Sequence, residues 1–104
     1  MKAIILCVND DRSNHQIFNT GSDPAEEIAI IDLAKKIWKM VNGDGSEALI
    51  SYIPYSDFGK YEDVMRRVPD ISKLKSFFDF KSNWSLEQGL IKTIAWQRES
   101  IGKD

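Results

Sequence analysis

Pro69 marks the sharpest boundary in this chain of 104 residues, and it constrains the local fold more than any other single residue. The proline ring disfavours the α region at Val68, so the backbone before it is expected to be extended. Asp70, directly after it, can accept hydrogen bonds from the first amides of a helix. Arg66 and Arg67 precede this boundary. The sequence therefore predicts two cationic side chains on extended backbone next to a capped helix.

Paired guanidinium groups offer planar, forked donors for a diphosphate or a carboxylate, and their charge does not titrate in the physiological range. Neighbouring side chains on extended backbone point to opposite sides, so we expect only one of the pair to face a ligand and favour Arg66. Arginines on loops are also commonly solvated or paired with nearby carboxylates such as Glu62 and Asp63. These residues alone leave both interpretations open.

Hydrophobic periodicity predicts about four helices. Apolar residues recur with helical spacing over residues 30–42, and a shorter apolar helix is expected over residues 2–9. A third helix should follow Asp70, and a final helix should begin near Ser85, which starts a capping-box pattern. These four segments account for most of the regular structure that the sequence predicts.

Two or three short strands are expected between the helices. Residues 16–19 have the composition of a strand that ends at a glycine turn, and residues 48–53 are rich in apolar and aromatic side chains. There is no repeat, low-complexity tract or long linker to divide the chain. The predicted fold class is therefore α/β, a small mixed domain in which residues 1–104 form a single folding unit.

Composition excludes some partners and limits others. The chain is 42% hydrophobic and 29% charged, which is ordinary for a globular domain. Fourteen basic and sixteen acidic residues give a net charge of -2, which argues against nucleic acid and anionic membranes as partners. The apolar run near the N-terminus is too short for a signal peptide. A single cysteine excludes an internal disulfide, so a cytoplasmic location is the default expectation.

Independent catalysis is not predicted. His15 and Cys7 lack the further ligands that a zinc site requires. The adjacent acidic pairs look solvated, because nothing apolar is arranged to raise the pKa of a general acid. We therefore expect no catalytic, metal-binding or cofactor-binding residue in this chain.

Three separated groups of residues carry a family resemblance. The first is I-F-N-T-G-S followed by I-A-I-I-D-L-A, the second is R-R-V-P-D-I-S-K, and the third is F-F-D-F followed by S-L-E-Q-G-L-I-K-T-I. In this order they resemble the C-terminal end of NAD-dependent nucleotide-sugar epimerases and dehydratases, which belong to the extended short-chain dehydrogenase/reductase family. The resemblance runs through most of the chain.

The resemblance implies a fold, a partner and a site. It implies the C-terminal, substrate-binding part of an extended Rossmann-type enzyme that binds a UDP- or dTDP-sugar. The Gly-rich turn and the Tyr-x-x-x-Lys pair of that family are missing, so NAD is expected only in the complete enzyme, on a Rossmann domain present in cis or in trans. The roles of contacting the substrate diphosphate and ribose fall on Lys60, Asp63, Arg66 and Arg67.

Aromatic residues of the same loop have two interpretations. Tyr55, Phe58 and Tyr61 could flank the nucleotide base, although aromatic loop residues more often pack onto the domain beneath them. The alternative for the whole chain is a stand-alone interaction domain that associates with a Rossmann-type chain or with itself as a homodimer.

Overall fold

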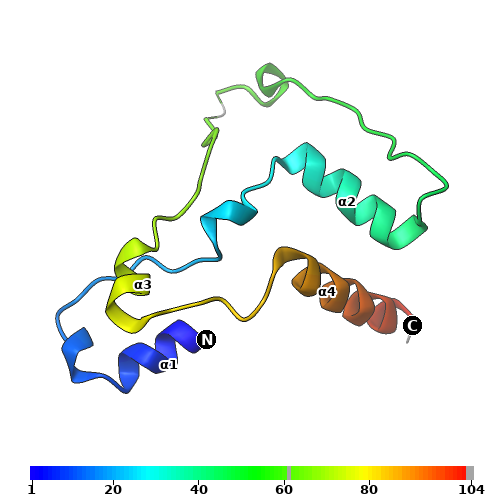
Figure 1. Cartoon of the computed structure of the whole chain (residues 1–104). Helices are drawn as coiled ribbons and strands as arrows, with labels where there is room; N and C mark the ends of the chain where they lie inside the picture. Colours follow the sequence, from blue (N-terminus) through cyan, green and yellow to red (C-terminus); the bar gives the residue numbers. More distant parts are fainter. Residues whose placement is uncertain (61, 103–104) are drawn as a thin grey trace. The chain divides into compact units, whose positions relative to one another are not determined.

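The structure is a computed structural model that describes residues 1–60 and 62–102, and these residues contain four α-helices and no strand (Figure 1). They form two compact units. Unit 1 comprises Met1–Glu27 and Val68–Leu86, and unit 2 comprises Ile28–Arg67 and the residues from Glu87 onward. The α-helices are α1 (Lys2–Val8), α2 (Ile30–Asn42), α3 (Ser72–Phe78) and α4 (Leu86–Ile101), and three short 3-10 segments are η1 (Asp11–Ser13), η2 (Pro24–Glu26) and η3 (Tyr55–Phe58).

The four predicted helices are confirmed, because their start and stop signals are local. α2 covers the predicted residues 30–42 and ends before Gly43, whose φ of 76° lies in the region that glycine adopts without steric cost. α3 ends at Asp79 in the left-handed conformation, with φ 49° and ψ 41°. Aspartate tolerates this conformation better than most residues do.

The predicted α/β class, with two or three short strands, is wrong. Neither residues 16–19 nor residues 48–53 form a strand, and no other described residues do. A strand persists only where a neighbour satisfies its backbone N–H and C=O groups, and β-propensity measures the fit to such a half-buried surface. The two segments belong to different units, and neither has a paired neighbour among the described residues.

Unit 1 is organised around Leu74 of α3, whose side chain is 0% exposed. This side chain contacts Ala3 of α1 and Phe80, which follows α3. Phe18 approaches the same cluster, and its ring centroid lies 5.0 Å from that of Phe77 in an edge-on arrangement. Residues distant in sequence therefore share one small apolar core.

Two contacts hold the segment around Gly21 against the start of α3. A Cβ atom on Gly21 would lie 2.5 Å from Cγ of Pro69, so only glycine fits without movement of the proline. The Lys73 ammonium donates to the carbonyl of Ile17 at 2.9 Å and lies 4.9 Å from the ring centroid of Phe18. Pro69 therefore serves as a packing surface as well as a chain boundary.

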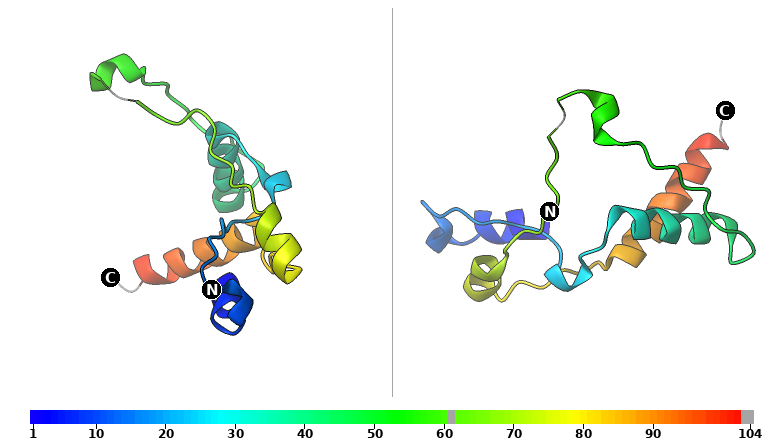
Figure 2. Two further views of the ribbon diagram at one scale, coloured as in Figure 1. Left: turned by 90° about the vertical axis from the view of Figure 1, so that its left-hand side faces the viewer. Right: turned by 90° about the horizontal axis from the view of Figure 1, so that it is seen from above.

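Polar contacts connect the two helices of unit 2. The Lys36 ammonium lies 3.7 Å from a carboxylate oxygen of Glu87, and the Arg98 guanidinium donates to the carbonyl of Val41 at 2.9 Å. All the buried hydrophobic residues of the described chain belong to unit 1. The described residues between α2 and α3 include η3 and no other helix (Figure 2). None of the helices in residues 1–60 and 62–102 has the length and apolar character needed to cross a bilayer.

Gly21→Ala should destabilise unit 1, because the added methyl group collides with the Pro69 ring. Overpacking of this kind costs about 1–3 kcal/mol in the free energy of unfolding, measured by urea denaturation. Gly45→Ala is the matched control, since a Cβ there meets nothing within 4 Å. That control should be neutral or slightly stabilising. Equal effects of the two substitutions would contradict the close packing of Gly21 on Pro69.

Candidate functional site

The four predicted binding residues all lie in the loop between η3 and α3 and are exposed. The loop fixes Asp63 more firmly than the others. The hydroxyl of Tyr55 donates to Oδ2 of Asp63 at 2.8 Å, and the backbone N–H of Val64 donates to Oδ1 at 2.8 Å. A carboxylate offers about four lone-pair positions, so both oxygens can still accept further hydrogen bonds.

The cationic residues of the loop differ in their surroundings. Within the described residues, Lys60 and Arg67 have no hydrogen-bond or ion-pair partner, whereas Arg66 does interact with a neighbour. The structure therefore brings Lys60, Asp63, Arg66 and Arg67 into one exposed loop. Phe58 is exposed on η3, and Tyr61 lies outside the described residues.

The N-cap of α3 is Ile71 rather than the predicted Asp70, and α3 begins at Ser72, but Asp70 still contacts the first turn. Oδ1 of Asp70 accepts the backbone N–H of Ser72 at 2.9 Å. Hydrogen bonds from the Ser72 side chain and backbone hold the pKa of the Asp70 carboxyl below its ordinary value. The charged carboxylate is therefore the form that stabilises the beginning of α3.

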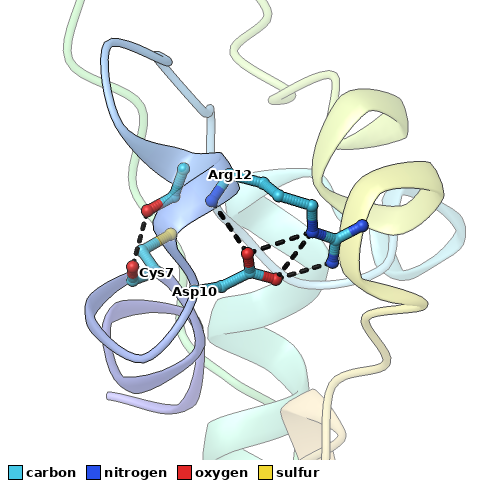
Figure 3. Close-up of polar contacts among 4 residues, drawn as sticks. Cys7, Asp10 and Arg12 are labelled. Carbon is cyan, nitrogen blue, oxygen red and sulfur yellow. Dashed lines mark hydrogen bonds and ion pairs between the residues drawn. The ribbon is translucent and has the colours of Figure 1, made fainter.

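Unit 1 contains a bidentate ion pair between Asp10 and Arg12 that was not predicted from the sequence. The Arg12 side chain donates to both carboxylate oxygens of Asp10, with the closest contact 2.6 Å between Nη2 and Oδ2 (Figure 3). The side-chain hydrogen bond from Arg12 lowers the pKa of Asp10. The Arg12 guanidinium also lies 5.2 Å from the ring centroid of Phe77. Because Arg12 already has an internal carboxylate, it is a structural residue rather than a free anion site.

A shallow hollow of about 280 Å³ on unit 2 was also not predicted. The indole N–H of Trp38 donates to the Ser46 hydroxyl at 3.1 Å, which connects α2 to the turn that follows it. A short ion pair of 3.1 Å joins Lys39 to Asp44 nearby. The hollow is lined by Lys35, Trp38, Lys39, Ser46, Glu47 and Ala48. It shares no residue with the predicted binding loop. Among the described residues, no three His, Cys, Asp or Glu side chains gather as metal ligands.

Comparison with known proteins identifies a relative among enzymes of nucleotide-sugar metabolism. Over 96 residues the chain is 35% identical to a UDP-N-acetyl-alpha-D-glucosaminuronate decarboxylase from Bacillus cytotoxicus. This chain is similar to part of a nucleotide-sugar decarboxylase. The match covers 90% of the chain but spans only 28% of the relative's length. No family model matches the chain, and no solved structure does.

The match supports the resemblance to nucleotide-sugar enzymes and refines it. The relative's name describes a decarboxylase, whereas the motifs had indicated epimerases and dehydratases. The greater part of the relative lies outside the matched stretch.

Acidification should weaken the start of α3. The folded-state pKa of Asp70 is lowered, so its contribution is complete above the unfolded value of about 3.9 and is lost as the pH falls through the lower folded value. In Asp70→Asn the amide oxygen can still cap the helix but no longer titrates. The amide resonance of Ser72, followed by NMR below about pH 4, should therefore move in the parent chain and stay nearly constant in the variant.

Asp57→Asn is the control for this titration, since Asp57 is an exposed aspartate on η3 in the other unit. It should leave the pH response of the Ser72 amide unchanged. A Ser72 titration that persists in Asp70→Asn would show that a different group causes it.

Proposed function

We propose that this chain is the nucleotide-sugar-binding portion of an NAD-dependent nucleotide-sugar enzyme. The proposal rests on the 35% identity over 96 residues to a UDP-sugar decarboxylase. It is supported by a loop that contains three cationic side chains and a carboxylate oriented by a hydrogen bond from Tyr55. Lys60, Arg66 and Arg67 contact the substrate diphosphate, and Asp63 accepts hydrogen bonds from ribose hydroxyls. The chain is catalytically silent by itself.

The surroundings of each side chain support this division of roles. Arg67 can offer its planar fork to a diphosphate without first breaking a contact among the described residues. Lys60 supplies charge but not bidentate geometry, so it contributes less to orientation. Asp63 is oriented by the Tyr55 hydroxyl, and its remaining lone pairs suit the donors of a ribose.

The described residues do not fit NAD. A dinucleotide site needs glycines directly after a strand, so that backbone amides can approach the pyrophosphate. Gly43 and Gly45 follow helix α2 instead, and Gly43 serves as its C-cap. In this proposal the cofactor and the redox steps therefore belong to a separate polypeptide region. The role of this chain is to hold the nucleotide so that the sugar can reach that region.

UDP titration of the chain tests the proposal. Backbone and arginine side-chain NMR signals should shift at residues 60 and 62–67, and added salt should weaken the binding because the contacts are ionic. Arg67→Ala should raise the Kd about tenfold or more, since a hydrogen bond between charged groups contributes about 1.5–3 kcal/mol. Arg67→Lys should give an intermediate loss, because it keeps the charge and loses the fork.

Lys35→Ala removes a cation from the hollow on unit 2 and serves as the matched control. It should leave the UDP affinity unchanged. A chain whose loop signals do not respond to UDP at millimolar concentration, or whose response is equally sensitive to Lys35 and Arg67, would contradict the proposed diphosphate contact.

The alternative function is a stand-alone interaction domain. One observation favours it, namely that unit 2 contains none of the buried hydrophobic residues of the described chain. Analytical ultracentrifugation distinguishes the two proposals. Self-association that is independent of nucleotide would support the interaction domain.

A further inference from the structure

An uncovered apolar segment in unit 2 points to a docking interface. Residues 49–58 contain five large apolar or aromatic side chains that are exposed, four of them by more than 60%, besides Tyr55, whose hydroxyl donates to Asp63. Leu49 is 95% exposed, Tyr52 79%, Ile53 64% and Phe58 62%, and Ile50 is also exposed. Single exposed apolar residues are normal on protein surfaces, but several large ones within ten residues of one segment point to an interaction site.

The accessible surface of the chain supports the same conclusion. The chain exposes 9075 Å² at a mass of 11.9 kDa. Two separate compact units of half this mass would together expose only about 7,200 Å². The excess of about 1,900 Å² does not depend on how the two units are placed, because contact between them only reduces the exposed area. An area of this order equals one side of a permanent protein interface.

Helix α2 adds a second apolar surface in the same unit. The apolar side chains of α2 recur with helical spacing, yet none of the described ones is buried. Leu33 and Ile37 are half-buried, and Ile30 is exposed. An amphipathic helix gains most of its stability in a protein by packing its apolar face, and here that packing is incomplete.

We propose that residues 49–58 dock on an apolar face of the polypeptide region that corresponds to the unmatched part of the decarboxylase. The identity of this partner rests on the proposed function. In the relative, the matching stretch is covalently joined to that larger region. Covalent linkage gives the region a high effective concentration, so it covers apolar side chains before a second copy of the chain can.

A chimera tests this interface. The matched stretch of the full-length decarboxylase is replaced by residues 1–102 of this chain, and the midpoint of thermal unfolding is measured. Leu49→Glu combined with Ile53→Glu should lower the midpoint by about 5 °C or more in the chimera, because both charges become buried without partners. In the isolated chain the same double substitution should change the midpoint by less than about 2 °C, since both side chains already face water.

Lys35→Glu is the control, since Lys35 is an exposed residue on α2. It should have a small effect in both contexts. If the glutamate variant of the chimera does not fold, Leu49→Ala combined with Ile53→Ala provides a milder change with the same expected contrast between the two contexts. Equal shifts in the chimera and the isolated chain would overturn the proposal, as would a parent chimera that fails to fold.

Sedimentation of the isolated chain separates the partner from a second copy. A concentration-dependent dimer that Leu49→Glu abolishes would replace the proposed occupant with another copy of the chain. UDP binding to the chimera reports separately on the proposed function. If the chimera does not bind UDP but the glutamate variant still lowers its unfolding midpoint more than that of the isolated chain, the diphosphate contact is refuted and the interface is supported. If the chimera binds UDP and the two midpoints shift equally, only the interface is refuted.

Discussion

Enclosure of Leu74 between α1, α3 and Phe80 is the contact on which the described core depends. This small core forms because residues from both ends of unit 1 meet, and Gly21 allows them to meet by leaving room for the Pro69 ring. Pro69 therefore acts twice. It ends the extended approach to α3, and it provides the surface against which the earlier segment packs. A core of so few side chains leaves little reserve, since the net stability of a domain is a small difference between large terms.

Unit 2 has a different physical character. Its helices are well formed, and one ion pair and one side-chain-to-carbonyl hydrogen bond connect them, but exposed contacts of this kind contribute little to stability. Large apolar side chains in residues 49–58 face water instead of a core. The hydrophobic effect, which dominates folding, is thus largely unused in this unit. Unit 2 has the surface properties of a subunit that is completed by association.

The sequence predicted those features whose causes are local. Asp70, Gly43 and Asp79 each act on neighbouring backbone, and the helices that they begin or end lie where the sequence placed them. The strands over residues 16–19 and 48–53 were wrong because a strand depends on a partner that composition does not reveal. The same limit applies to the site. The sequence showed that the four candidate residues share one loop, whereas the Tyr55–Asp63 hydrogen bond and the hollow at Trp38 depend on how the chain turns between helices.

The exposure of the binding loop and the exposure of the apolar segment have a common consequence. A guanidinium in bulk water gains less from an anion than a shielded one does, because water screens the charge and solvates both partners. In the proposed role, Arg67 would therefore bind the diphosphate more tightly when a neighbouring surface excludes water from the contact. Residues 49–58 precede the loop directly in sequence, and docking through them would bring such a surface close to it. Association and nucleotide binding are then energetically coupled, so a partner that covers the apolar side chains also raises the affinity for the nucleotide.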